Sequence, residues 1–195
     1  MLNDLLPLTT YCFVMSITPG PNNVMLASSG ALFGYRRALP QLLGTNSGVA
    51  LQTFATCLGL GSLFALYPLL HQVLRVAGAL YLVYLAWRLC ASSLGEARHA
   101  RPLSFAQAVL FQAVNPKSWV KAITLATVFM PAGLSAPVGA LLVAGIGLVV
   151  GFPSASMWAL FGMAMRRLLT DPRKQRAFNL TMGATLLVLA ASFLR

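Results

Sequence analysis

Long runs of apolar residues alternate with short connections along the chain. Six runs can be drawn, at residues 5–32, 39–66, 69–90, 104–130, 137–162 and 178–194. About 20 apolar residues in a helix cross the hydrocarbon core of a bilayer. Only the connections 91–103 and 163–177 are clearly polar. The pattern predicts an all-α, polytopic membrane protein with six transmembrane helices, folded as a single domain over residues 1–195.

The first and fourth runs are interrupted by residues that helices avoid. The first contains TPGPNN at residues 18–23, and the fourth contains NPK at residues 115–117. Proline cannot donate a backbone hydrogen bond and glycine tolerates unusual dihedral angles, so these sequences should open the helix. Proline suits the first turn of a new helix, and asparagine suits the position before it. We therefore expect a second half-helix to begin near Pro21 and another near Pro116.

The two breaks lie half a chain apart. Pro19 and Pro116 are separated by 97 residues (116 − 19) in a chain of 195. Each break opens a set of three runs, so the two sets must cross the bilayer in opposite directions. This arrangement predicts a 3+3 inverted-topology repeat with halves of about 1–97 and 98–195, in which the broken first and fourth helices meet at the midplane.

Composition supports the membrane assignment and changes the meaning of the charge. Hydrophobic residues make up 58% of the chain, charged residues 9%, and the mean hydropathy is +0.77. Soluble domains carry about 25% charged residues. A net charge of +11 would suggest nucleic acid in a soluble protein, but here the basic residues lie mostly in short loops. We therefore expect the lipid bilayer, and no nucleic acid, as the partner.

The positive charges also predict an orientation. The first, third and fifth connections and their flanks carry Arg36, Arg37, Arg88, Arg98, Arg101, Arg166, Arg167, Arg173, Lys174 and Arg176. Arg75 and Arg195 lie toward the opposite side. Short basic loops face the cytoplasm, so six spans would place both termini outside.

Two lysines lie inside the fourth run. Lys117 and Lys121 are one helical turn apart on the same face, and the three acidic residues of the chain, Asp4, Glu96 and Asp171, all lie outside the runs' interiors. A lysine at the bilayer centre costs about 2.5–3.5 kcal/mol on insertion scales. Such charges should line water, reach toward the interface or meet an anion. Lys117, nearer the break, is the better functional candidate, and Lys121 is left open.

The breaks predict a binding site for an anionic group. Half-helix N-termini present free N–H groups and the positive end of the helix dipole, and two of them meeting at the midplane suit a carboxylate. A substrate with two positive charges would need an acid in the membrane, and the spans contain none. We expect no metal and no cofactor. The expected substrate-binding residues are Thr18, Pro19, Gly20, Pro21, Asn22, Asn115, Pro116 and Lys117.

The motifs together resemble a known family. TPGPN, the basic GYRRAL at residues 34–39, the glycine-rich second run and NPK resemble the LysE/RhtB family of bacterial amino-acid exporters over essentially the whole chain. The FQAVNPK context looks most like the cysteine/O-acetylserine exporter branch. The resemblance implies an inner-membrane secondary carrier that exports amino acids and is driven by the proton motive force, and it leaves open a homodimer. The residues that match the family motifs are Pro19, Gly20, Pro21, Asn22, Asn115, Pro116 and Lys117.

The lack of an intramembrane acid argues against the branch that exports basic amino acids. Neutral substrates remain, such as cysteine, O-acetylserine, threonine or homoserine. A membrane enzyme is disfavoured because the chain has no HExxH, no GxSxG and no paired carboxylates, and His71 and His99 lie apart near loops. A passive channel or a structural subunit of a membrane complex would share the helices, but neither explains two mid-membrane breaks beside an unpaired lysine as well.

Small residues predict close contacts between helices. The segment GTNSG at residues 44–48 and the glycines of the fifth run allow helix backbones to approach, which membrane helices need because lipid gives no hydrophobic reward for association. Asn46 and Trp119 stay open between contact with a substrate and packing.

Overall fold

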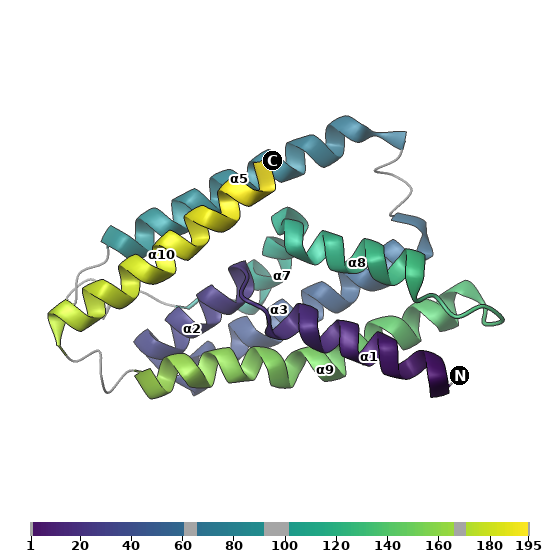
Figure 1. The fold of residues 1–195 in the computed structure, drawn as a ribbon, viewed down its shortest axis with the longest axis horizontal. Helices are drawn as coiled ribbons and strands as arrows, with labels where there is room; N and C mark the ends of the chain where they lie inside the picture. The colour runs from purple at the N-terminus through teal and green to yellow at the C-terminus, as the bar shows by residue number, and fades with distance from the viewer. Residues whose placement is uncertain (1, 61–65, 92–101, 166–170, 195) are drawn as a thin grey trace.

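The computed structural model describes residues 2–60, 66–91, 102–165 and 171–194, and within these ranges it contains helices and no β-strand. Most helices run along the long axis of the molecule (Figure 1). The all-α prediction is confirmed. In chain order the elements are α1 (Leu2–Ile17), α2 (Pro21–Phe33), α3 (Tyr35–Ala55), the π-helical turn η1 (Thr56–Leu60), α5 (Pro68–Ala91), α7 (Phe105–Val114), α8 (Pro116–Val128), α9 (Ala136–Met165) and α10 (Pro172–Leu194).

Both helix breaks occur where the sequence places them. Pro21 is the first residue of α2, and Gly20 before it is extended, with φ −172°. Pro116 is the first residue of α8, and the side chain of Asn115 accepts a hydrogen bond from the backbone N–H of Lys117 at 3.2 Å. The expected combination of proline and an asparagine cap is therefore confirmed at the second break.

Two of the predicted runs differ from the helices that form. The second run does not give one helix over 39–66, because α3 already begins at Tyr35 and ends at Ala55. In η1, Gly59 has φ +116°, a conformation that favours glycine and ends regular helix geometry there. The last run also begins earlier, since α10 starts at Pro172. Hydropathy missed these limits because the flanking turns are apolar at Gly59 and basic at the start of α10.

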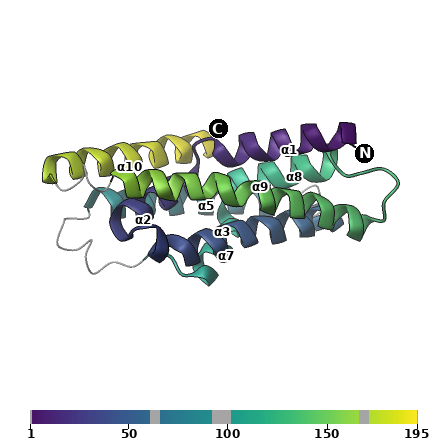
Figure 2. The same cartoon turned by 90° about the horizontal axis from the view of Figure 1, so that it is seen from below.

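The helices pack in pairs that involve both halves of the chain. Helix α9 lies along α1 and α2, α3 lies along α7 and α8, and α3 packs against α9. Helices α5 and α10 pack mainly against each other (Figure 1), and Figure 2 shows α9 beside α1. Helix α9 thus lies along the first broken helix and α3 along the second, and the two broken helices also contact each other.

Glycines allow the closest of these contacts. A Cβ atom on Gly162 of α9 would collide with the backbone of Ala27 in α2, and one on Gly30 of α2 would collide with the backbone of Ala159 in α9. Gly44 in α3 lies in the same way against the backbone of Phe105 in α7. The predicted role of the small residues in helix packing is confirmed at Gly44 and Gly162, and Gly30 adds a close contact that the sequence did not predict.

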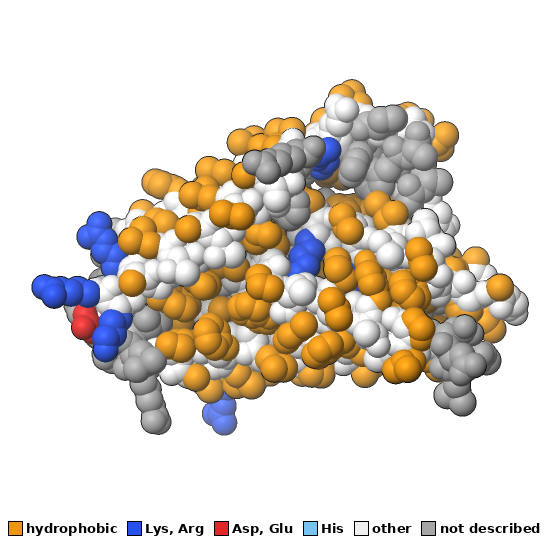
Figure 3. Space-filling view, viewed as in Figure 1, with side chains coloured by type: hydrophobic (Ala, Val, Ile, Leu, Met, Phe, Trp, Pro, Cys, Tyr) orange, Lys and Arg blue, Asp and Glu red, His pale blue; other side chains and the backbone are white. Residues whose placement is uncertain are grey.

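The outer surface is largely apolar. Leu51, Leu80 and Val149 are 62%, 65% and 72% exposed, and apolar side chains cover much of the face seen in Figure 3. Basic side chains gather at the end of the molecule where α10 begins (Figure 3). Such a surface is poorly suited to water and well suited to lipid.

By length and composition, two helices of the described chain could each cross a bilayer unaided, Gln72–Ala91 and Ala136–Met165. The halves of the broken helices are shorter: α1, α2, α7 and α8 have 16, 13, 10 and 13 residues. A break in the middle of a span leaves two half-helices that are each too short to cross a bilayer alone, so the six-span count stays a prediction. Four of the arginines behind the predicted orientation, Arg98, Arg101, Arg166 and Arg167, lie outside the described residues, as does Arg195.

Candidate functional site

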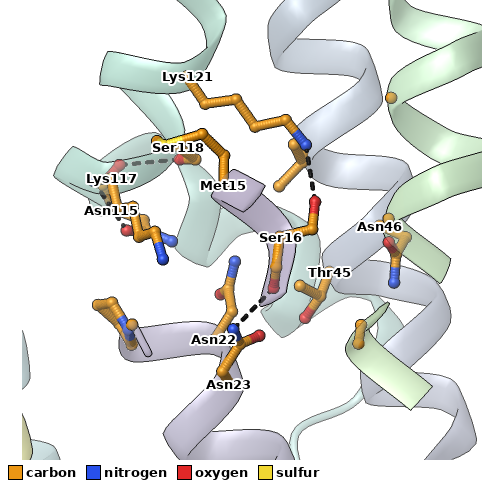
Figure 4. A pocket seen from close by; sticks show the side chains of 16 residues that line it. Met15, Ser16, Asn22, Asn23, Thr45, Asn46, Asn115, Lys117, Ser118 and Lys121 are labelled. Atoms are coloured by element: carbon orange, nitrogen blue, oxygen red, sulfur yellow. Dashed lines mark hydrogen bonds between the residues drawn. The ribbon is translucent and has the colours of Figure 1, made fainter. Parts of the chain in front are cut away.

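The two breaks meet at a small cavity. Its volume is about 60 Å³, and its walls come from the end of α1, the first turns of α2 and α8, and the facing sides of α3 and α9. Figure 4 shows polar side chains pointing into it from several helices. The lining side chains labelled there are those of Met15, Ser16, Asn22, Asn23, Thr45, Asn46, Asn115, Lys117, Ser118 and Lys121.

Most of the residues expected at the site lie in these walls. Gly20, Pro21, Asn22, Asn115 and Lys117 line the cavity. The remaining three, Thr18, Pro19 and Pro116, do not line it and instead belong to the backbone of the two breaks. Among the polar lining residues, sequence reasoning missed Ser16, Asn23, Thr45 and Ser118. Each stands in or next to a segment that the sequence singled out: Ser16 lies just before TPGPNN, Asn23 ends it, Thr45 lies inside GTNSG and Ser118 follows NPK.

Lys117 connects the second break to the first. Its Nζ donates hydrogen bonds to the carbonyl and the hydroxyl of Thr18 at 2.7 and 2.8 Å and to the carbonyl of Pro19 at 3.1 Å. An ammonium group has three donors, so these three bonds can use them all. The carbonyls follow the C-terminus of α1, where the helix dipole favours a cation. The sequence left water, the membrane interface or an anion as partners for Lys117, and the structure adds partners within the protein.

Gly20 makes room for this lysine. A Cβ atom at Gly20 would lie 2.7 Å from Cδ and 3.0 Å from Nζ of Lys117. Glycine at this position is therefore needed for close approach of the side chain rather than for a positive φ.

The other carbonyls at the end of α1 are bound by side chains from α2 and α9. Asn23 Nδ2 donates to the carbonyls of Ser16 and Thr18, both at 2.8 Å. Trp158 Nε1 donates to the carbonyl of Ile17 at 3.1 Å. Backbone groups freed inside a membrane must find partners in the protein or in a water-filled cavity. At the first break the protein itself supplies these partners.

The second break is held by Gln112, a residue that sequence reasoning missed. It is 1% exposed and forms a reciprocal pair with Asn22, in which Asn22 Nδ2 donates at 3.0 Å and Gln112 Nε2 donates back at 3.2 Å. Its backbone carbonyl accepts from Gln52 Nε2 at 3.1 Å. A glutamine within an apolar run carries no local signal for such a role.

Trp119 and Asn46, left open by the sequence, have different roles. Trp119 Nε1 donates to the carbonyl of Ala113 at 2.8 Å, next to the second break, and Trp119 is not among the residues that line the cavity. Asn46 does line it, and its Nδ2 donates to the carbonyl of Leu42 at 2.9 Å. Trp119 thus packs against the backbone of its own break, whereas Asn46 is available to the cavity.

Lys121 is the more deeply buried of the two lysines. It is 6% exposed, and its Nζ donates to Ser16 Oγ at 3.1 Å. In Figure 4 its side chain extends from its helix across the cavity to Ser16. Of the alternatives that the sequence left open, reaching out toward the membrane interface is therefore wrong for Lys121.

Comparisons with known proteins give a consistent result. A family model described as a LysE type translocator matches residues 13–195. The cysteine/O-acetylserine efflux protein of Escherichia coli strain K12 is 33% identical over 171 residues, which cover 85% of this chain and 86% of that protein. The protein of the same name from Shigella flexneri gives the same values, and that from Escherichia coli O1:K1 is 32% identical over the same length. No solved structure matches the chain.

Proposed function

The chain belongs to the LysE family of translocators, a family of transmembrane amino-acid exporters, and on that premise we propose that it is an inner-membrane secondary carrier for neutral amino acids. The relatives at 33% identity are cysteine/O-acetylserine efflux proteins. Cysteine and O-acetylserine are therefore the first substrates to consider, with threonine and homoserine as chemical neighbours. The activity is transport, not an enzymatic reaction.

The cavity at the two breaks carries this proposal. It combines two helix N-termini and two lysines, and the sequence has no Asp or Glu between residues 5 and 95 or between 97 and 170. This positive environment suits a carboxylate. At about 60 Å³ the cavity is smaller than the ~300–1,000 Å³ pockets that hold drug-sized ligands, which favours a small substrate.

We assign the substrate-binding role to the break residues themselves. Gly20, Pro21, Asn22, Asn115 and Lys117 would form the walls around the substrate. The three that do not line the cavity would fix the shape of the breaks: Thr18, Pro19 and Pro116. The carrier would act as a single domain with halves of about 1–97 and 98–195.

The proposed architecture is six spans in a 3+3 inverted repeat, and one pair of contacts supports it. Asn22 and Lys117 each follow the proline that starts a second half-helix. Asn22 pairs with Gln112 in the last turn of α7, and Lys117 binds the carbonyl of Thr18 just after α1. Each second half-helix therefore contacts the end of the first half-helix of the other repeat. This is expected if a pseudo-two-fold axis relates the two halves.

An efflux assay tests the function. Cells are loaded with a panel of amino acids, and efflux is compared between cells with the protein and cells without it. We expect faster loss of cysteine or O-acetylserine with the protein, and no such difference after an uncoupler collapses the proton gradient. Lys117→Ala should abolish the difference, because the carbonyls that follow α1 lose their partner.

The control is Lys174→Ala, an exposed lysine at the start of α10, at matched expression. It removes the same charge far from the breaks and should leave efflux unchanged. Efflux that persists without any gradient would favour a passive channel. Equal amino-acid efflux with and without the protein would contradict the carrier and favour a structural subunit.

A further inference from the structure

The two lysines of α8 have different surroundings although they lie one turn apart. The three donors of the Lys117 ammonium are used by the carbonyl and hydroxyl of Thr18 and the carbonyl of Pro19, just after α1. Lys121 makes one hydrogen bond within the described chain, to Ser16 Oγ at 3.1 Å. We propose that Lys121 binds the carboxylate of the transported amino acid, and that Lys117 is a positioning residue that holds the two breaks together. This assignment rests on the function proposed above.

The unused hydrogen-bond donors of Lys121 are the first reason to place a carboxylate there. An ammonium group has three N–H donors, and the bond to Ser16 uses one. The side chain is 6% exposed and lines the cavity, so a ligand in the cavity can reach its other donors. A buried donor without a partner is unfavourable. Two oxygens of a carboxylate would supply the missing partners.

The positive charge of the buried Lys121 ammonium is the second reason. An ammonium buried in a membrane protein is costly unless a counter-charge or water offsets it. Lys117 on the same face adds a like charge, and the sequence has no Asp or Glu between residues 5 and 95 or between 97 and 170. The counter-charge must therefore come from outside the chain, and the substrate of an amino-acid carrier brings one.

The opposite wall of the cavity completes the recognition of an amino acid. Asn46 uses its Nδ2 for the carbonyl of Leu42, which leaves Oδ1 as an acceptor. A Cβ atom on Gly151 would lie 2.9 Å from that oxygen, so it faces α9 at the cavity wall. Asn46 and Thr45 thus offer acceptors to an α-ammonium group while Lys121 binds the carboxylate.

The test compares an acid with its amide. L-cysteine and L-threonine are titrated into the full-length protein in lipid nanodiscs by calorimetry, each beside its carboxamide, in chloride-free buffer with a thiol reductant. The wild type should bind the better acid at least about tenfold more tightly than its amide, because the amide lacks the charge. Lys121→Gln should reduce this ratio to within about twofold, and Lys121→Arg should keep most of it.

Lys174→Gln is the matched control, because Lys174 is an exposed lysine at the start of α10 and does not line the cavity. It should leave the acid-to-amide ratio close to that of the wild type. Lys117→Gln, on the same face as Lys121, should lower the thermal stability and change the ratio less than Lys121→Gln does. If Lys121→Gln does not fold, Ser16→Ala takes its place. This change removes one hydroxyl, the group that holds the Lys121 ammonium, and should change the ratio several-fold.

The outcomes separate this assignment from the proposed function. If the wild type prefers the acid and the acid-to-amide ratio is unchanged in Lys121→Gln or Ser16→Ala, the role of Lys121 is overturned. The proposed carrier function is not affected by that result. If Lys117→Gln loses the preference for the acid over the amide and Lys121→Gln keeps it, Lys117 binds the carboxylate instead. A wild type that binds neither acid contradicts the proposed substrates and this inference together. If sodium chloride alone stabilises the wild type as much as the acids do, and does not stabilise Lys121→Gln, the site binds halide and the carboxylate assignment falls.

Discussion

Consecutive carbonyls at and after the end of α1 are bound by side chains from three other helices. Asn23, Trp158 and Lys117 reach them from α2, α9 and α8. Lys117 and Trp158 lie 99 and 141 residues from their acceptors, whereas Asn23 lies only 5 to 7 residues away, across the break itself. The break is therefore as much a product of tertiary contacts as of Pro19 and Gly20.

The indole of Trp158 provides a direct test at this scale. Trp158→Phe keeps an aromatic ring but removes the N–H that binds the carbonyl of Ile17. A buried acceptor without its donor costs about 1–3 kcal/mol, which corresponds to a fall in Tm of several degrees for a chain of this size, at about 2–4 °C per kcal/mol. Thermal unfolding of the purified protein in detergent measures it.

Trp87→Phe is the matched control, because Trp87 is 65% exposed on α5. Its Tm should stay close to that of the wild type. An equal loss of Tm in both variants would show that the indole of Trp158 contributes through its size and not through its hydrogen bond.

Local chemistry explains which residues of the site could be predicted. Proline, glycine and asparagine act on their own backbone, so Gly20, Pro21 and Asn115 could be placed from the sequence. The contacts of Lys117 with Thr18 and of Gln112 with Asn22 could not, because they join residues 99 and 90 positions apart and no local pattern links them.

At the scale of elements, α9 shows two kinds of glycine in one helix. Gly162 lies against the backbone of Ala27 in α2, whereas a Cβ atom on Gly145 would have nothing within 4 Å. Gly162→Ala should force α9 away from α2 and destabilise the fold. Gly145→Ala should be neutral or stabilising by about 0.5–1 kcal/mol, because alanine favours the helix. Urea or thermal unfolding of the two variants side by side measures the difference.

A result in which both alanines are tolerated would mean that the α2–α9 contact can open without loss of stability. The close approach between the two helices would then be adaptable, and the small residues would not be required for packing.

Element limits were harder to predict than element number. The runs 69–90 and 137–162 agree closely with α5 and α9 because each is one uninterrupted apolar helix. The run 39–66 failed because Gly59 interrupts it with a residue that hydropathy reads as apolar. Hydropathy reports burial in lipid, but it does not report the backbone angles that end a helix.

At the scale of the whole molecule, the orientation is open to a topology test. Arg36, Arg37, Arg173, Lys174 and Arg176 are exposed, and short basic connections stay in the cytoplasm. Fusions of alkaline phosphatase after Arg195 should be active and fusions of a fluorescent protein there should be dark, since we expect the C-terminus outside. Fusions within residues 171–176 should behave in the opposite way.

If the same reporter were active at both fusion positions, either the six-span count or its orientation would be wrong.

The pairing of α9 with the first broken helix and of α3 with the second could not be predicted from the sequence. A hydropathy pattern counts the helices but does not say which of them touch.

Two of the contacts that cross between the halves at the breaks are chemically unequal. Asn22 joins Gln112 through a neutral amide pair, whereas Lys117 joins the carbonyls of Thr18 and Pro19 through a charge. If the carrier alternates by parting these contacts in turn, the two openings have different free energies, since hydrogen bonds from a charged donor are the stronger. The resting equilibrium of the empty carrier is then tilted toward one side of the membrane, and each cycle starts from that preferred state.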